Sequence, residues 1–405
     1  MRILISGASI AGPVLAYWLT RYGFEVTVVE RAPVLRKTGG HAVGLFRPAM
    51  DIVEKMGLID RVHAKRTGTE RLTMYREGRK GSIELEIGRL VRAISDRHVE
   101  IMRDDLSEIF YDATRDAVDY VFDDSITSIS DDGEVTFERG PAGRFDLVVG
   151  ADGLHSNVRR LVFGPESSYA SWIGAYLAVM SVPNHLGLDG RMESILGVGL
   201  MVGMYGTAHM DDARALFLFR TPRPLDYHHR DVARQKELLR ARFEGVGWEV
   251  PRLLAQLDST PAFYFDSITQ LRLDTWSRGR VTLVGDAGHC PGPAVGGSTS
   301  LAVVGAYVLA GELAAAGGDY ERALRAYAAE IGDYVRGARA LAVSAAKRLV
   351  PGSAFDLWTL AQGARLVGHL PTGLVRAASR LGGQGVRVHD SITLKDYSAY
   401  EVAWT

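Results

Sequence analysis

The sequence predicts an α/β protein in which a Rossmann-like dinucleotide-binding domain carries an inserted antiparallel β-sheet domain and ends in C-terminal helices. Residues 2–30 have the order strand, glycine-rich turn, helix, strand, which is typical of a βαβ unit. From residue 172 to about 265, apolar or alternating runs between turn residues predict an antiparallel sheet. The strand-to-glycine pattern returns at Arg280, so the sheet is predicted to be an insertion. We expect the dinucleotide-binding domain at 1–170 and 266–318, the sheet domain at 171–265 and a helical segment at 319–405.

The composition is that of an ordinary globular protein. The chain has 405 residues, a formal net charge of -1 and 47% hydrophobic residues, which is enough to build a core. Near-neutral charge disfavours nucleic acid or an anionic membrane as the main partner. The single cysteine, Cys290, cannot form an internal disulfide, and no Cys/His cluster has metal-ligand spacing. We therefore expect a cytoplasmic protein that binds no metal.

No segment is predicted to act as a signal peptide or to cross a membrane. The N-terminal apolar run is interrupted by a polar, glycine-rich turn. The most apolar later stretch, residues 301–318, contains Glu312 and is broken by glycines. A buried helix is the better interpretation of that stretch.

The first part of the chain predicts a parallel sheet with helices between its strands. Residues 2–6 and 25–30 are continuous apolar strands, and a helix is predicted from about Ile10 to Tyr22. Residues 118–140 alternate and turn at Asp-Asp-Gly, which predicts a hairpin. Further predicted elements are helical turns within 48–64 with Gly57 as a stop, a strand that runs into a helix within 99–114, a buried strand from 145, and helices within 320–349 and 354–370.

The turn "SGASIAG", residues 6–12, has the residue types of a pyrophosphate-binding turn. Gly7 permits the tight turn after the strand, and Gly12 lets the helix pack closely on the sheet. Ser9 stands where the backbone approaches the pyrophosphate, and its hydroxyl could donate to a phosphate. Ile10 and Ala11 begin the helix, whose N-terminus carries partial positive charge. A plain turn without a ligand would account for the glycines equally well, so the motif alone is weak evidence.

Glu30, at the end of the second strand, strengthens the nucleotide prediction. A carboxylate at this position accepts both ribose hydroxyls of an adenosine, and Arg31 follows it directly. An acid here also disfavours a 2'-phosphate, so the site suits FAD or NAD and not NADP. The alternative is a solvated charge at a strand end.

A second strand-to-glycine turn lies at residues 279–300, "GRVTLVGDAGHCPGPAVGGSTS". A buried strand meets Asp286, a loop rich in glycine and proline follows, and an apolar helix begins after the loop. A third motif, "GADGLHSNVRR" at 150–160, follows another buried strand and contains Asp152. Asp152 could cap the helix that carries Arg159 and Arg160.

Taken in order, "GASIAG…VVER", "GADGLHSNVRR" and "GDAGHCPGPAVGGS" resemble the three fingerprints of the group A flavoprotein monooxygenases. These enzymes share the fold of para-hydroxybenzoate hydroxylase and include aromatic hydroxylases and the tetracycline-inactivating monooxygenases. The resemblance extends over nearly the whole chain, from Arg2 to the final "KDY". It implies an FAD enzyme that uses NADPH or NADH and O2. Since the flavin carries the chemistry, no catalytic side chain is predicted.

The resemblance also implies why two distant turns are needed. The first turn takes the adenosine and pyrophosphate, and the second is the ribityl and flavin site, where Asp286 would bond a ribityl hydroxyl. Arg103 would reach the FAD from a neighbouring helix, and Asp152 would lie near the FAD and the reduced nicotinamide. Surface positions are the alternative for the arginines. The expected cofactor-binding residues are Gly7, Ser9, Ile10, Ala11, Gly12, Glu30, Arg31, Arg36, Arg103, Asp152, Gly285, Asp286, Pro293, Gly296, Gly297, Ser298 and Thr299.

Two departures from the family pattern stand close to the expected flavin. Ser298 replaces a glycine and could narrow the site, and Gly44 stands where related sequences often carry an acid. Gly305-Ala306 replaces an Asp-Ala pair. Within the loop, Cys290 is interpreted as a packing residue and His289 as a hydrogen-bonding one.

The implied activity is that of an FAD-dependent monooxygenase. Through a C4a-hydroperoxyflavin it would hydroxylate or otherwise oxygenate a small aromatic or polyketide-like molecule of secondary metabolism. The alternative is an enzyme in which FAD is a scaffold for a cyclisation or rearrangement without net redox, which the two departures allow. A plain NAD dehydrogenase is disfavoured by the second flavin loop. The apolar segment 195–205 would roof the substrate, although core packing explains the same residues.

Overall fold

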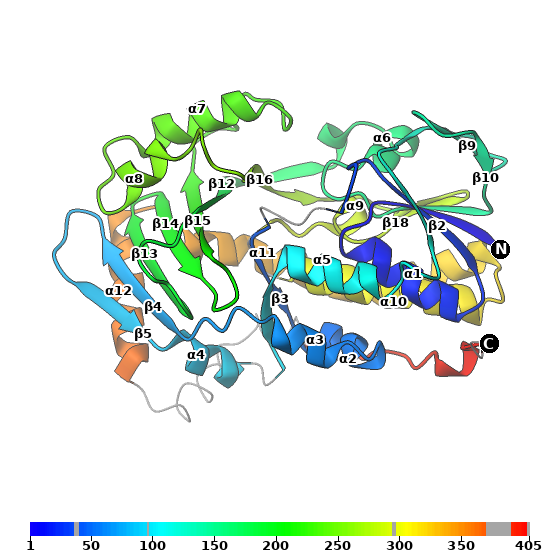
Figure 1. The fold of residues 1–405 in the computed structure, drawn as a ribbon, viewed down its shortest axis with the longest axis horizontal. Helices are drawn as coiled ribbons and strands as arrows, with labels where there is room; N and C mark the ends of the chain where they lie inside the picture. Colours follow the sequence, from blue (N-terminus) through cyan, green and yellow to red (C-terminus); the bar gives the residue numbers. More distant parts are fainter. Residues whose placement is uncertain (36–39, 95–96, 294–296, 370–389, 403–405) are drawn as a thin grey trace.

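The computed structural model describes residues 1–35, 40–94, 97–293, 297–369 and 390–402. Two predicted cofactor residues, Arg36 and Gly296, lie outside the described residues. The molecule has two halves side by side, a nucleotide-binding half on the right of Figure 1 and, on the left, a half built on a second sheet that is antiparallel except at one strand pair, β13 (Arg191–Gly197) with β4 (Arg71–Arg76). The α/β class predicted from the sequence is confirmed.

A six-stranded sheet forms the centre of the nucleotide-binding half, in the order β17-β18-β11-β1-β2-β7. All neighbours run parallel except β17 and β18. The apolar side chains of β1 are fully buried because helices cover the sheet. The strands are β1 (Arg2–Ser6), β2 (Glu25–Glu30), β7 (Asp119–Phe122), β11 (Leu147–Gly150), β17 (Ser277–Arg278) and β18 (Val281–Leu283).

Two helices that begin at the glycine-rich turns pack against each other in this half. They are α1 (Ala11–Arg21) and α10 (Ser298–Ala315), and α10 also packs on α11 (Tyr320–Leu349). Of the helices in the described part of the chain, only α10 is long and apolar enough to cross a membrane. It is 78% buried inside the molecule, as expected of a core helix.

The predicted hairpin at 118–140 is partly wrong. Its first strand, β7, pairs in parallel with β2 at the edge of the main sheet. Asp123 has a φ of 62°, which ends that strand, and the Asp124 carboxylate accepts the backbone N–H groups of Arg139 and Gly140. Only β8 (Ile126–Ile129) and β9 (Glu134–Phe137) form the hairpin, and β10 (Gly143–Arg144) adds a third strand to it.

A seven-stranded sheet forms the other half, in the order β16-β12-β15-β14-β13-β4-β5. It is not confined to residues 171–265, because two of its strands come from earlier in the chain. The division into domains at 170, 265 and 318 therefore remains a proposal about folding units and does not describe the sheet. The strands are β4 (Arg71–Arg76), β5 (Ser82–Leu85), β12 (Ala170–Pro183), β13 (Arg191–Gly197), β14 (Leu200–Gly206), β15 (Asp212–Arg220) and β16 (Phe263–Leu271).

Helices cover both faces of this sheet, which explains its continuous apolar strands. One face packs against α7 (Val232–Phe243) and α8 (Val250–Ala255), and the other against the end of α11 and α12 (Ala354–His369). Val202 points into the first core and Met201 into the second. The apolar segment 195–205 is therefore accounted for by core packing on both sides.

Shorter elements complete the helices and strands of the two halves. They are β3 (Ala42–Leu45), α2 (Arg47–Lys55), α3 (Ile59–Ala64), α4 (Ile87–Ile94), β6 (Val99–Met102), α5 (Arg103–Asp112), α6 (Asn157–Val162) and α9 (Asp286–His289). Helix α11 joins the two cores, because Tyr327 lies in the core of the nucleotide-binding half and Ala342 in that of the sheet half.

The C-terminal residues 390–402 return to the nucleotide-binding half (Figure 1). The buried Glu312 carboxylate of α10 accepts hydrogen bonds from Lys395 and from the Tyr397 hydroxyl, both at 2.8 Å. The Tyr397 ring lies directly on Gly311, where a Cβ atom would be 2.2 Å from the ring. The backbone N–H of Val402 donates to the Arg21 carbonyl at the end of α1. The tail therefore fastens α1 and α10.

We predict that Tyr397→Ala lowers the free energy of unfolding by about 3 kcal/mol, because it removes a buried ring and leaves Glu312 with one fewer partner. Denaturant unfolding measures the change. Tyr400→Ala is the matched control, since Tyr400 belongs to the same tail but is 43% exposed. Equal stabilities of the two variants would show that the tail does not fasten α10.

Candidate active site

The turn between β1 and α1 can be built only with glycine at two positions. Gly7 has a φ of 109°, and a Cβ atom on it would lie 2.6 Å from the carbonyl oxygen of Ala151. A Cβ atom on Gly12 would lie 1.9 Å from the carbonyl oxygen of Gly7. The helix therefore starts in direct contact with the turn, as the sequence motif predicts.

Two side chains of α5 hold this turn. Arg103 donates from Nη2 to the Ser9 hydroxyl at 3.1 Å, and the Ser107 hydroxyl donates to the Ser9 carbonyl at 3.0 Å. A guanidinium thus stands at the predicted pyrophosphate turn, where it would attract an anion. Ser107 was not singled out from the sequence, because nothing in a helical pattern marks a serine that faces a distant turn.

The Glu30 carboxylate holds two loops, the turn that follows β1 and the loop that follows β2. Its Oε2 accepts the backbone N–H of Ala8 at 3.0 Å, and its Oε1 accepts that of Ala32 at 2.8 Å. Each carboxylate oxygen keeps a second lone pair for a ribose hydroxyl. Glu30 therefore has a structural role, its role at a ribose remains a prediction, and Arg31 beside it is exposed.

The second glycine turn lies against the first. Gly285, between β18 and α9, has a φ of 63°, and a Cβ atom on it would lie 3.1 Å from the Ala11 Cβ and 3.3 Å from the Ala302 Cβ. Ala11 starts α1 and Ala302 belongs to the first turns of α10. Three elements far apart in the sequence therefore meet at one point, next to Asp286.

Asp286 is held by one of the residues that depart from the family pattern. The Ser298 hydroxyl donates to Asp286 Oδ1, and burial raises the pKa of this carboxyl. Ser298 and Thr299 open α10, which Gly297 caps with a φ of 85°. The apolar helix predicted after the loop thus begins at Ser298, and the Ser298 hydroxyl orients the Asp286 carboxylate. Pro293 is half-buried at the edge of the described loop.

Asp152 has the structural role that the sequence left open. Its carboxylate accepts the backbone N–H groups of Asn157 at 2.8 Å and Val158 at 3.1 Å, together with the Ser156 hydroxyl. It therefore anchors the start of α6, for which Ser156 is the N-cap. Its place near a cofactor remains a prediction.

Side chains of the sheet half hold residues 40–42. The Gly40 carbonyl accepts from Arg214 Nε at 3.2 Å, and the Ala42 N–H donates to the Tyr205 hydroxyl at 2.8 Å. Arg214 and Tyr205 belong to strands β15 and β14, so the sheet reaches across to this loop. Both were missed from the sequence, because their register in an antiparallel sheet depends on pairing with distant strands.

The structure gives a local reason for the departure at Gly44. A Cβ atom at this position would lie 2.9 Å from His98 Nε2, so an acidic side chain would have to displace that ring. The Ser300 hydroxyl donates to the Gly44 carbonyl at 3.2 Å and accepts the Phe46 N–H at 2.9 Å. The first turn of α10 is thereby tied to β3.

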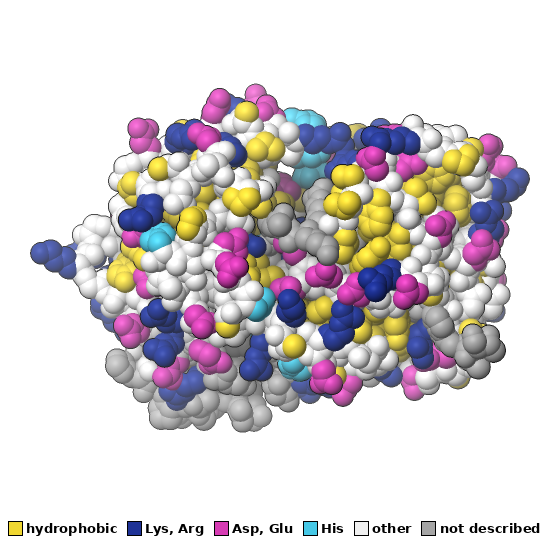
Figure 2. All heavy atoms as spheres, viewed as in Figure 1, with side chains coloured by type: hydrophobic (Ala, Val, Ile, Leu, Met, Phe, Trp, Pro, Cys, Tyr) yellow, Lys and Arg dark blue, Asp and Glu magenta, His cyan; other side chains and the backbone are white. Residues whose placement is uncertain are grey.

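Polar groups face one another where the two halves meet, and the surface is hollowed there (Figure 2). The His41 and Tyr264 rings are 5.7 Å apart. Burial, and next the Arg103 charge, lower the pKa of His41 to about 4, so the imidazole is neutral at pH 7. It could therefore accept or donate a hydrogen bond without carrying charge.

His289 and Cys290 have the roles predicted for them. The buried His289 places Nε2 2.8 Å from the Tyr327 hydroxyl, and burial lowers its pKa to about 3. Cys290 is fully buried, and burial raises its pKa well above the ordinary value, so the thiol is inert packing. Within the described residues, no group of three His, Cys, Asp or Glu side chains is placed to hold a metal ion.

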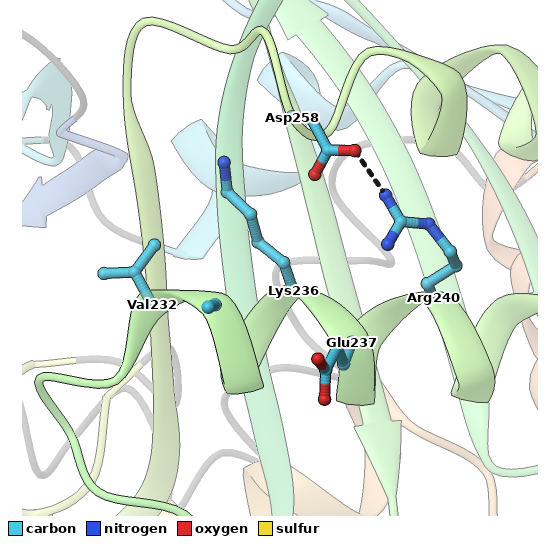
Figure 3. A pocket seen from close by; sticks show the side chains of 6 residues that line it. Val232, Lys236, Glu237, Arg240 and Asp258 are labelled. Atoms are coloured by element: carbon cyan, nitrogen blue, oxygen red, sulfur yellow. Dashed lines mark hydrogen bonds and ion pairs between the residues drawn. The ribbon is translucent and has the colours of Figure 1, made fainter.

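A separate cavity of about 430 Å³ lies along α7, away from these residues (Figure 3). Asp258 and Arg240 form an ion pair at 3.0 Å beside it. Its lining includes none of the predicted cofactor residues, so we do not assign it to the active site. The lining residues are Val232, Ala233, Lys236, Glu237, Arg240 and Asp258.

The chain is similar to known proteins over most of its length. Residues 1–339 match the FAD binding domain family. A flavin-dependent monooxygenase of Legionella longbeachae is 39% identical over 330 residues, which is 81% of this chain and 84% of that protein. An uncharacterized protein of Mycobacterium tuberculosis is 45% identical over 333 residues, or 81% of this chain and 89% of that protein.

Solved structures of similar chains share the fold over nearly the full length. The tetracycline destructase Tet(55) superposes with a TM-score of 0.81 at 34% identity, covering 98% of each chain. Klebsiella pneumoniae HpxO, solved with FAD and uric acid, superposes with a TM-score of 0.74 at 22% identity, covering 98% of each chain, which shows the fold alone.

We predict that Asp286→Ala folds but retains little FAD. Loss of a hydrogen bond to a charged group costs about 1.5–3 kcal/mol, so the dissociation constant should rise at least about tenfold. Flavin fluorescence quenching measures it. Asp274→Ala, a change at an exposed acid of the same half, should leave affinity unchanged. Unaltered FAD occupancy in Asp286→Ala would remove Asp286 from the site.

Glu30→Ala should also weaken FAD by about tenfold or more, through the lost ribose contacts. Because Glu30 also holds two loop amides, the unfolding free energy of the variant has to be measured alongside its FAD affinity. Glu25→Ala, at the exposed start of the same strand, is the control. A Glu30 variant that loses stability but binds FAD normally would restrict this residue to its structural role.

Proposed function

The chain belongs to the FAD-dependent monooxygenase family that carries this FAD binding domain, and on that premise we propose that it uses NADPH or NADH and O2 to oxygenate a small aromatic or polyketide-like molecule. One observation carries the proposal: Gly285 lies between the starts of α1 and α10, so the turn with Asp286 and the pyrophosphate-type turn face one site. A single long cofactor with two ends fits that arrangement.

The residues present fit FAD. We propose that the first turn and the N-terminus of α1 hold the pyrophosphate, with Arg103 beside it, and that Glu30 holds the adenosine ribose. Asp286, oriented by Ser298, would hold the ribityl chain. When bound, FAD supplies hydride acceptance and the activation of O2.

The start of α10 would tune the flavin. The first backbone N–H groups of a helix have no partner within the helix, and they carry partial positive charge. In α10 the Leu301 N–H donates to the Gly297 carbonyl, and we propose that the amides that precede Leu301 in the first turn face the flavin. They would stabilise negative charge on a reduced flavin.

The junction between the halves would hold the substrate. Tyr264 and Tyr205 from the sheet and the neutral His41 offer hydrogen-bonding groups there. Similarity to tetracycline destructases, at 34% identity, supports a planar, polycyclic or aromatic molecule. Ser298 and Gly44, which left room for a non-redox role of FAD, have local structural explanations, so they no longer favour that alternative.

We predict that the physiological substrate accelerates NADPH oxidation and yields a product heavier by one oxygen atom that derives from labelled O2. NADPH absorbance, O2 uptake and product mass measure the three quantities on the same sample. Conversion at full rate without NAD(P)H or O2, and without a gain in mass, would replace this proposal with the scaffold role of FAD.

Gly297→Val should uncouple or block that reaction, because valine disfavours the left-handed backbone that caps α10 and adds bulk at the proposed flavin site. Gly279→Val is the matched control, since Gly279 has a φ of 55° but open space around it. The ratio of product formed to NADPH consumed should fall in the first variant alone. Equal ratios in both would argue against a role for the α10 cap.

A further inference from the structure

Four charged side chains form a continuous series between the two halves. His155 Nε2 lies 3.0 Å from Asp266 Oδ2 on β16 of the sheet. His155 Nδ1 lies 3.1 Å from each oxygen of Glu166. Glu166 in turn accepts from Arg159 Nη2 at 2.6 Å. Negative and positive groups alternate along the series.

The series ends at the proposed flavin loop. Arg159 is 1% exposed, and its Nη1 donates to the Ala287 carbonyl at 2.9 Å. Ala287 directly follows Asp286. A guanidinium buried to this extent needs a neutralising partner, and Glu166 is that partner. Arg159 thus helps to hold Ala287 in place, alongside Arg339, which donates to the Gly288 carbonyl at 3.4 Å.

With both carboxylates ionised, the geometry favours a His155 ring that carries a proton on each nitrogen. A neutral imidazole has one donor and one acceptor, so it could not donate to carboxylates on both sides. Burial would lower the pKa of His155, but the hydrogen bonds to Asp266 and Glu166 outweigh it and raise the pKa to about 9. The imidazolium therefore persists at neutral pH.

The remaining charged and titratable groups around His155 support this state. His229 stacks on its ring with centroids 4.2 Å apart. Burial, and next the charge of His155, lower the pKa of His229 to about 4, so His229 adds no second charge at pH 7. His228 and Arg230 flank His229 in the sequence and contribute smaller repulsion to it.

We propose that His155 is a positioning residue that ties strand β16 of the sheet, through Glu166 and Arg159, to the loop that carries Asp286. The inference rests on the proposed function only in taking Asp286 as an FAD anchor. It goes beyond that function because it links the sheet, which would hold the substrate, to the grip on the flavin. Asp266 lies 3.4 Å from the Tyr264 hydroxyl, so the sheet end of the series is next to the junction.

The pH dependence of this linkage follows from the direction in which the pKa of His155 is shifted. The folded pKa, about 9, lies above the unfolded value of 6.5, so this contribution is fully present below about pH 6.5. It declines as pH rises and is lost as pH passes through the folded pKa. The linkage between strand β16 and the loop that carries Asp286 should therefore weaken as the pH rises over that range.

The test compares holoenzymes of the parent, His155→Gln and His185→Gln. His185 is the matched control, because it pairs with Glu249 at 2.8 Å within the sheet half. We expect FAD release on dilution to accelerate in the parent as pH rises from about 6 to about 10, and His155→Gln to release FAD about tenfold faster at neutral pH with a flat profile. Identical profiles in the parent and His155→Gln would overturn the proposal.

Hydrogen exchange provides a readout that does not need FAD. The N–H groups of Gly288 and His289 bond to the Gly285 carbonyl, so they report on the loop directly. They should exchange faster in His155→Gln than in His185→Gln. If the purified parent protein contains no FAD, the proposed function is wrong. The hydrogen-exchange rates of Gly288 and His289 still test the role of His155 in that case. Unchanged exchange would overturn that role.

A second variant, Asp266→Asn, tests the same linkage if His155→Gln fails to fold. It keeps the shape of the side chain that faces His155 Nε2 and removes its negative charge. The pH midpoint of FAD release, or of exchange at Gly288 and His289, should move down in this variant. An unmoved midpoint would show that His155 does not couple the sheet to the loop.

Discussion

The architecture depends on close backbone approach at one point, where β1, β11 and β18 end. Gly12 touches the Gly7 carbonyl, Gly7 touches Ala151, and Gly285 fits between Ala11 and Ala302, so a side chain at any of the three glycines would push these elements apart. Because parallel strands end at one edge of a sheet, a ligand at this edge can contact all three loops at once. The rest of the nucleotide-binding half keeps these contacts in place, with α5 on the first turn and the C-terminal tail across α1 and α10.

The sheet half reaches the same point by a different means. Its strands are apolar on both faces because helices cover both, and the polar side chains that matter stand at its junction with the other half. Arg214 and Tyr205 hold the loop at residues 40–42, and Asp266 meets His155. The two halves are thus connected by hydrogen bonds and ion pairs as well as by α11, which contributes to both cores.

Local signals in the sequence were sufficient for the nucleotide-binding elements and insufficient for the contacts between distant ones. Continuous apolar strands and obligatory glycines marked β1, α1, β2, β18 and the start of α10 at close to their observed bounds. β4, β5 and β7 were missed or misassigned because short, half-polar strands carry no sign of their partners. His155 lies inside the motif at residues 150–160, but only folding brings Asp266 and Glu166 to its two ring nitrogens. Ser298 was noted as a departure, and its bond to Asp286 depends on the loop geometry.

The order of strands in the main sheet has a consequence for synthesis of the chain. β1 pairs with β11, and β11 pairs with β18, so β1 is synthesised well before the strands that complete its side of the sheet. The tail residue Val402 then closes on Arg21. Contacts between such distant residues form slowly, and an emerging chain cannot complete them until residue 402 has left the ribosome. A ligand that contacts all three loops at this edge would therefore be bound late, and a chain that lacks residues 390–402 would leave Glu312 of α10 without its Lys395 and Tyr397 partners.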